Sequence, residues 1–268
     1  MSVSNLTVRF GSVTALENIT LETPPGQITA VVGGDGAGKS TLLKAMVGLV
    51  EVEAGTVQTP ERAQIGYMPA DAGSWADLTV DENVEFVGGS YGLAGTDLAE
   101  RADELLKRAG LDGARDRLVG QLSGGMRNKL GFCLATLHRP ELLILDEPST
   151  GLDPVSRVEL WRLITRAAAH GTAVVLATTY MDEAERTGSV LVLERGRALL
   201  SGSPDSIVAQ SPGVVVETPR PQRPQYAWRS GEAFREWWPQ SPPPGMHIAP
   251  LTLEDVAIVA SLEGGERA

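Results

Sequence analysis

The chain has 268 residues, of which 42% are hydrophobic, so it can bury a substantial core in one large domain or one domain with an appendage. Acidic residues outnumber basic ones by 34 to 23, and the net charge of −11 argues against a general affinity for nucleic acid or anionic lipid. The only cysteine, Cys133, excludes an internal disulfide and a cysteine-based zinc cluster.

The sequence carries no uninterrupted apolar run of membrane-spanning length, and residues 1–5 lack the basic and apolar regions of a signal peptide. We therefore expect a cytoplasmic protein. Any attachment to the inner face of the cell membrane is expected to come through a protein partner.

Alternating apolar and polar residues over 6–10 and 16–21 predict two half-exposed antiparallel strands. The first ends at Phe10, just before a glycine turn. An aromatic ring there suits a platform on which an adenine base stacks, although an ordinary edge aromatic gives the same pattern.

A glycine-rich loop follows the apolar run 28–32 and precedes a helical segment at 42–47. Strand, loop and helix in this order predict a phosphate-binding P-loop (Walker A motif), because glycine amides and the helix start surround phosphate oxygens. The lysine reaches the β- and γ-phosphates, and the serine hydroxyl is a ligand for Mg²⁺. The predicted nucleotide-binding residues are Phe10, Gly33, Gly34, Asp35, Gly36, Ala37, Gly38, Lys39, Ser40 and Thr41.

The next part of the chain alternates between short strands and helices. Residues 55–57 and 64–69 are strand-like, and 81–91 and 97–109 have helical spacing. Glycines 110 and 113 end the second of these helices.

A second anion-binding geometry is predicted where Leu122-Ser123-Gly124-Gly125-Met126 opens a helix that runs to about residue 138. Ser123 is a natural N-cap, and the two glycines leave backbone amides approachable. Without further context, a plain helix cap explains the same residues.

Residues 142–148 predict a buried strand of a parallel sheet that ends in two acids, Asp146 and Glu147. Ligands of α/β sheets bind at the carboxyl ends of strands. Asp146 suits the positioning of Mg²⁺, and Glu147 suits a general base that orients the attacking water.

The chain then continues as helix, strand, short helix and hairpin. A helix is expected from Pro154 to about residue 170, a buried strand over 172–178, and a short acidic helix over 181–186. Residues 190–201 predict a closing hairpin.

Composition changes near residue 211, because eight of the 17 prolines lie between Pro212 and Pro244, together with three tryptophans. We predict a small, irregular appendage over 211–268 that ends in a helix over 251–262. The tryptophans either pack it onto the main body or form a partner-binding surface.

Together these motifs resemble one family, the ATP-binding subunits of ABC transporters, over about residues 3–210. The resemblance is strongest to bacterial exporter ATPases of the drug and antibiotic-resistance kind. Residues 251–256 of this chain also resemble the tail motif of that subgroup. It implies an α/β fold: a P-loop NTPase core with a mainly parallel sheet, an antiparallel β subdomain and an α-helical signature subdomain. The predicted ATPase domain covers 1–210, with its helical subdomain at about 70–140.

The family implies a pair of ATPase domains with two ATP molecules and Mg²⁺ between them, coupled to an integral membrane permease. The signature residues would then contact the partner's ATP; they are Ser123, Gly124, Gly125 and Met126. Glu147 would serve as the catalytic base, and Ser40 and Asp146 would hold Mg²⁺.

Two positions depart from the family pattern. A glutamine is expected where the chain has Ala70, and a histidine is expected where it has Thr179. Alanine offers no side-chain hydrogen bond, and threonine offers a short neutral one. We therefore predict that this chain's own site binds MgATP and hydrolyses it slowly, and that its signature completes a more active site on a non-identical partner. Asp71 is a candidate substitute for the glutamine.

Three functions fit these residues. The first is the ATPase subunit that energises a membrane exporter, whose substrate the sequence does not name. The second is a regulatory module in which ATP promotes dimerisation with little turnover. The third is a soluble ABC ATPase outside transport, against which the acidic charge balance weighs.

Overall fold

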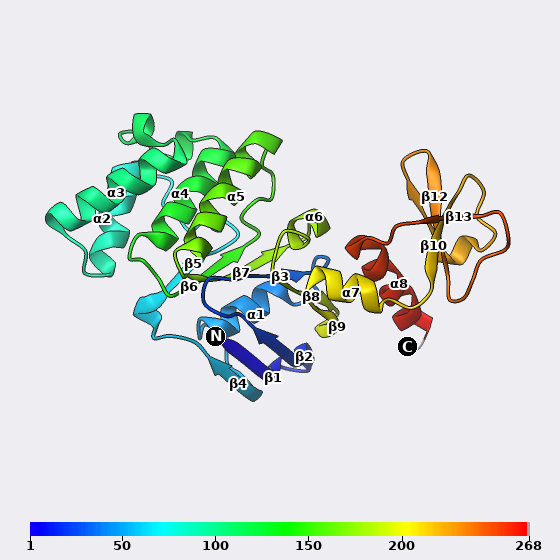
Figure 1. Cartoon of the computed structure of the whole chain (residues 1–268). Coiled ribbons are helices and arrows are strands. Elements are labelled where there is room, and N and C mark those ends of the chain that lie inside the picture. Colours follow the sequence, from blue (N-terminus) through cyan, green and yellow to red (C-terminus); the bar gives the residue numbers. More distant parts are fainter. Residues whose placement is uncertain (267–268) are drawn as a thin grey trace.

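The computed structural model describes residues 1–266. Its strands form three sheets, and its helices cover both faces of the largest one. The predicted fold class is confirmed by a mainly parallel sheet with separate antiparallel sheets and a group of helices. Figure 1 shows these parts in sequence colours.

The central sheet has the strand order β5-β6-β7-β3-β8-β9. Its first five strands are parallel and the last pair is antiparallel. The strands are β5 (Ile65–Met68), β6 (Leu142–Asp146), β7 (Ala173–Thr178), β3 (Ile28–Val32), β8 (Ser189–Glu194) and β9 (Arg197–Gly202). Strands β3, β6 and β7 are buried over their whole length, as expected for apolar runs with both faces covered.

One face of the central sheet packs on α1 (Lys39–Met46) and on an antiparallel sheet of order β2-β1-β4. That sheet consists of β1 (Ser2–Phe10), β2 (Val13–Glu22) and β4 (Ala54–Gln58). Side chains alternate along each strand, so Ile144 and Val175 point to this layer and their neighbours point to the opposite one. The expected pair of N-terminal antiparallel strands is thus present.

Helices cover the opposite face of the sheet. They include α4 (Gly124–Thr136) and α5 (Pro154–Ala169), which pack on it, and α2 (Val80–Ser90) and α3 (Gly95–Ala109), which extend outward from α4. Short 3-10 helices lie at η1 (Arg62–Gln64), η2 (Asp112–Ala114), η3 (Val119–Gln121) and η4 (Pro224–Tyr226). Cys133 is buried among these helices as a small apolar side chain, and burial raises the pKa of its thiol to about 12.

The expectation of an irregular appendage is wrong. The chain forms a four-stranded antiparallel sheet of order β11-β12-β10-β13, seen at the right of Figure 1. Its strands are β10 (Val214–Thr218), β11 (Ala227–Ser230), β12 (Ala233–Trp238) and β13 (His247–Ala249). Proline clusters misled the prediction because they lie in the loops between short strands and not inside them.

The last helix, α8 (Leu253–Glu266), connects this C-terminal sheet to the main body. Its residues Leu253 and Val256 pack beside Val190 and Val192 of the central sheet, next to α6 (Met181–Ala184) and α7 (Pro204–Gln210). Farther along, Val259 of α8 packs against Trp237, which favours the packing alternative for that tryptophan. The proposed boundary at residue 211 stays a prediction.

Among residues 1–266, no helix is long and apolar enough to cross a membrane.

Candidate functional site

The P-loop, residues 33–40, lies between the end of β3 and the start of α1, as expected. Gly36 and Gly38 have φ values of 77° and 109°, a left-handed backbone that favours glycine. A Cβ on Gly33 would lie 2.4 Å from the carbonyl oxygen of Leu193, so the loop packs too closely for any side chain there. Gly38 caps α1 without a side-chain bond, which leaves the first amides of the helix available to a ligand.

Lys39 is buried, and its ammonium group lies inside the loop. Its Nζ donates to the carbonyl oxygens of Gly33 at 2.7 Å and Gly34 at 3.2 Å. The same Nζ lies 3.1 Å from Oε1 of Glu147. The chain thus holds one cation, fixed by three oxygen atoms, at the centre of the predicted phosphate site.

The two acids at the end of β6 face the P-loop in different ways. Asp146 is buried, and its Oδ1 accepts a hydrogen bond from Ser40 Oγ at 3.1 Å. Burial is the main cause that raises the pKa of Asp146, and the negative charge of Glu147 adds to it. Glu147 has a left-handed backbone with φ of 51°, an uncommon conformation for a side chain of its size. Its Oε2 accepts from Thr150 Oγ1 at 2.8 Å.

The Ser40 and Asp146 pair fits a bound Mg²⁺. A hydroxyl and a carboxylate oxygen lie together at the mouth of the P-loop, and Mg²⁺ prefers oxygen ligands. No group of three or more acidic, histidine or cysteine side chains that could hold a metal occurs in residues 1–266. Mg²⁺ typically takes one or two protein ligands and fills its shell with phosphate oxygens and water.

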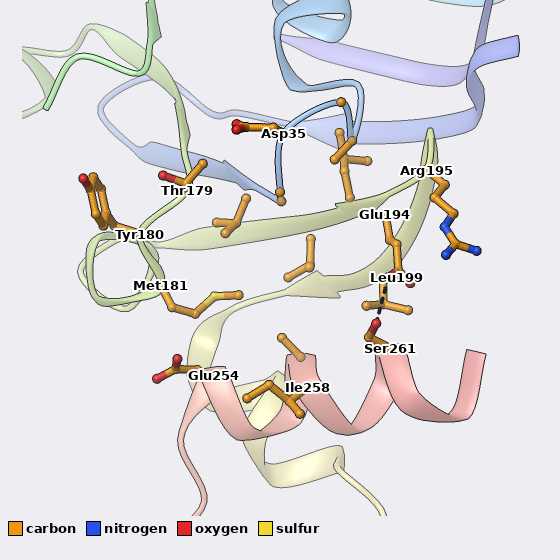
Figure 2. Close-up of a pocket in the computed structure, with 18 of the residues that line it drawn as sticks. Asp35, Thr179, Tyr180, Met181, Glu194, Arg195, Leu199, Glu254, Ile258 and Ser261 are labelled. Atoms are coloured by element: carbon orange, nitrogen blue, oxygen red, sulfur yellow. Dashed lines mark hydrogen bonds between the residues drawn. The ribbon is translucent and has the colours of Figure 1, made fainter. Parts of the chain in front are cut away.

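The two positions that depart from the family pattern, Ala70 and Thr179, each come just after a strand of the central sheet. Thr179 follows β7, is exposed, and lines a cavity together with P-loop residues; Figure 2 shows it on the segment next to Asp35. Ala70 is exposed in the turn after β5. Asp71 accepts from the backbone N–H of Gly73 at 3.1 Å, so one of its oxygens already stabilises that turn.

Tyr67, on β5 just before this turn, is not among the site residues predicted from the sequence. Its hydroxyl is half-buried, and burial, with the charges of Asp146 and Asp71, raises its pKa to about 12. The phenol therefore stays protonated near the acidic end of β6. A tyrosine in a short strand carries no signal of such a position, since only the neighbouring strand brings Asp146 near it.

The signature residues begin α4 as expected. The Ser123 side chain accepts from the Met126 N–H at 3.2 Å and caps the helix. A Cβ on Gly125 would lie 2.6 Å from Ser156 Oγ of α5, whereas Gly124 faces open space. None of these residues lines the cavity beside the P-loop in the described part of the chain.

Phe10, at the end of β1, is 52% exposed and pairs with Val13, which is also exposed. Its ring is free to contact a ligand. The predicted role as an adenine platform stays a prediction.

A cavity of about 770 Å³ lies beside the P-loop and has a wall that the sequence analysis did not foresee. Figure 2 shows α8 forming this wall opposite Asp35. Ser261 Oγ on α8 donates to Glu194 Oε1 of β8 at 2.7 Å, which holds the helix against the strand. A tail helix separated from the P-loop by more than 200 residues gives no sequence signal of this contact.

Similar proteins are known for this chain. A family model described as ABC transporter matches residues 16–150. The Nod factor export ATP-binding protein I of Cupriavidus metallidurans is 34% identical over 227 residues, which cover 81% of this chain and 75% of that protein. The daunorubicin resistance ATP-binding protein DrrA2 of Streptomyces coeruleorubidus is 36% identical over 210 residues, which cover 74% of this chain and 65% of that protein.

A solved structure of an ATP-binding subunit of an ABC transporter has a TM-score of 0.72 and 30% sequence identity to this chain. The alignment covers 78% of this chain and 92% of that one. Most of this chain therefore has the fold of an ABC transporter ATP-binding subunit.

Proposed function

This chain belongs to the ABC transporter family of ATP-binding proteins, and on that premise we propose that it is the ATPase subunit of an exporter. The observation that carries the proposal is the buried Lys39 ammonium, surrounded by P-loop carbonyls and Glu147 beside the Ser40 and Asp146 pair. Export is favoured by the names of the two relatives, which refer to Nod factor export and daunorubicin resistance.

Binding exchanges the contacts of the P-loop for contacts to phosphate. Lys39 Nζ turns from the carbonyl oxygens of Gly33 and Gly34 to the β- and γ-phosphate oxygens, and the free amides at the start of α1 donate to the same groups. Bound Mg²⁺, held by Ser40 and Asp146, would neutralise charge that develops on the phosphates.

Glu147 then orients a water molecule in line with the γ-phosphate and accepts its proton. The water oxygen bonds to the γ-phosphorus while the bond from that phosphorus to the β–γ bridging oxygen breaks, and ADP leaves with the bridging oxygen. Contact with Lys39 and Thr150 fixes both carboxylate oxygens, so the base is positioned by its neighbours and by its left-handed backbone. Products leave when the Lys39 ammonium returns to the loop carbonyls.

We further propose that turnover at this site is slow. Ala70 and Thr179 place no amide and no imidazole beside the γ-phosphate, and one lost preorganised contact commonly costs about 10²–10³ in rate. Binding depends on the P-loop, which is complete. The intact signature would contact ATP held by a second, non-identical ATPase domain, and the pair would act on a membrane permease.

Substituting Lys39→Ala tests nucleotide binding. Loss of a charge-assisted contact to more than one phosphate should weaken MgATP binding about 100-fold or more, measured by calorimetry. Lys44→Ala, an exposed lysine on the same helix, is the matched control and should bind normally. Unchanged affinity in folded Lys39→Ala protein contradicts the proposal.

Restoring the missing groups tests the slow site. The double variant Ala70→Gln/Thr179→His should raise turnover about 10²-fold over the parent chain. Ala99→Gln/Thr165→His makes the same chemical changes on exposed helix positions and should leave turnover unaltered. A parent turnover of several per second, or no gain in the first variant, contradicts the slow-site proposal.

The same two positions favour a second candidate function, an ATP-dependent dimerisation module with little turnover. Analytical ultracentrifugation with and without MgATP separates the two. Dimerisation without phosphate release, even in the presence of a permease and a second ATPase, favours the module.

A further inference from the structure

A second cavity, of about 670 Å³, lies at the amino ends of the central strands, whereas the P-loop lies at their carboxyl ends. Its rim includes Pro25, Glu141 and Thr172, which precede β3, β6 and β7 respectively. Helices α3 and α5 form its sides. None of its lining residues belongs to the P-loop, the acidic end of β6 or the signature, so the proposed function leaves this cavity without a role.

The cavity is basic, although the chain is acidic. Four guanidinium groups line it against two carboxylates, in a protein with a net charge of −11. The arginines come from α3, from the turn after α4 and from α5; they are Arg101, Arg108, Arg139 and Arg166. Clustering of like charge at one concave place stabilises a bound anion.

Two of the four arginines already have structural partners. Arg101 donates to the carbonyl oxygens of Thr136 at 3.0 Å and Leu137 at 3.3 Å, and pairs with Glu104 at 2.8 Å. Arg108 also pairs with Glu104. Their charge remains in the cavity, but their donors are committed to the C-terminal end of α4 and to one carboxylate.

The other two arginines are available to a ligand. Within residues 1–266, no hydrogen bond, ion pair or ring contact involves the guanidinium group of Arg139 or Arg166. Arg139 has a left-handed backbone, with φ of 55°, held by an N–H bond to Thr136. Its charge helps to lower the pKa of Glu104, after the larger contributions of Arg101 and Arg108, so it faces the same basic cluster.

The rest of the lining combines the polar side chains of Thr136, His170 and Thr172 with apolar ones. Leu105, Phe132, Leu163 and Ala167 come from three helices, and Phe132 is almost fully buried. A volume of this size accommodates a small organic molecule, for which sites are mostly apolar with a few placed polar groups. Guanidinium groups bind carboxylate, sulfonate or phosphate oxygens by paired donors.

We propose that the Arg139 and Arg166 cavity binds a small organic anion that carries one acidic group on an apolar, ring-sized body. The acid contacts the two free guanidinium groups, and the body packs on Leu105, Phe132 and Leu163. Such a ligand bridges α3, α4 and α5, and binding would stabilise the folded state by mass action.

The probe for this site is 8-anilinonaphthalene-1-sulfonate, whose fluorescence reports transfer of its rings to an apolar site. Titration is done on the full chain with saturating MgATP, which occupies the P-loop. We expect one saturable site per chain that 2-naphthalenesulfonate displaces and the neutral 2-naphthalenemethanol does not.

The variant Arg139→Ala/Arg166→Ala should raise the dissociation constant of the probe tenfold or more. Arg162→Ala, an exposed arginine on α5 that does not line the cavity, is the matched control and should bind as the parent does. Retained MgATP affinity shows that the double variant is folded. Unchanged probe affinity in the double variant, equal loss in Arg162→Ala, or displacement by the neutral alcohol overturns the proposal.

Discussion

The two ends of the parallel strands in the central sheet are surrounded by different charged groups. We call them the carboxyl edge, where the strands end at the P-loop, and the amino edge, where the strands begin. At the carboxyl edge, one buried lysine lies among carbonyl oxygens and two acids, Asp146 and Glu147. At the amino edge, four arginines face two carboxylates in a cavity with a partly apolar lining. A lysine among backbone groups suits a polyphosphate that binds together with a metal ion. Paired guanidinium groups suit a single acidic group that binds without a metal ion.

The difference comes from the backbone around each edge. The P-loop supplies amides through its glycines, of which Gly33 and Gly38 leave no room for a Cβ, and one point charge completes the site. At the other edge, arginine side chains from three segments provide most of the positive charge. Substitutions at one edge should therefore leave the function of the other edge unchanged.

The largest effect is expected at the carboxyl edge, from Glu147→Gln. Removing a positioned general base should lower ATP turnover about 10²–10⁴-fold, while MgATP binding stays near that of the parent. Steady-state phosphate release and calorimetry measure the two quantities. The amino-edge variant Arg139→Ala/Arg166→Ala serves as the control and should leave turnover unchanged. If Glu147→Gln keeps parental turnover, another group activates the water.

The next effect is expected in stability, at the amino edge. Arg101→Ala removes the donor from two carbonyl oxygens at the end of α4, which should cost about 1–3 kcal/mol. For a chain of this size each kcal/mol corresponds to about 2–4 °C in Tm, measured by calorimetry.

Arg108→Ala is the matched control for that variant. It loses only a partly exposed ion pair with Glu104, which is worth about 0–1 kcal/mol. Equal losses in the two variants would mean that Arg101 acts through its ion pair and not through the carbonyl oxygens of α4.

Much of the carboxyl edge could be predicted from the sequence because its chemistry is contiguous. Residues 33–41 and the pair Asp146 and Glu147 follow buried apolar strands, and parallel strands bring their ends together. The structure adds what spacing cannot supply, namely the contact of Lys39 with Glu147 and the left-handed backbone of that glutamate.

The amino edge and the C-terminal region were not predictable in the same way. Four arginines from three segments converge only when α3, α4 and α5 are packed, and each alone is typical of a solvated helix face. Proline-rich loops concealed the strands β10 to β13. The contact of α8 with the central sheet depends on packing across the whole chain.

The smallest effect is a pH dependence at the carboxyl edge. Burial raises the pKa of Asp146 in the folded protein above the ordinary value of about 3.9 expected for the unfolded chain. Between these two values the folded state binds more protons than the unfolded state, so this group lowers stability as pH rises through the window. Mg²⁺ requires the ionised carboxylate, and the stabilisation that it adds to the ATP complex should therefore increase over the same window.

Melting temperatures with ATP, with and without Mg²⁺, measured from about pH 4 to pH 7, give this difference directly. We expect the Mg²⁺-dependent gain in Tm to disappear at a pH above the ordinary aspartate range. Asp146→Asn should have a small gain at every pH, and Asp205→Asn, an exposed acid on α7, should behave as the parent. A parental gain that persists to the lowest pH would mean that the metal is held without Asp146, and the oxygen pair with Ser40 would then be only a structural contact.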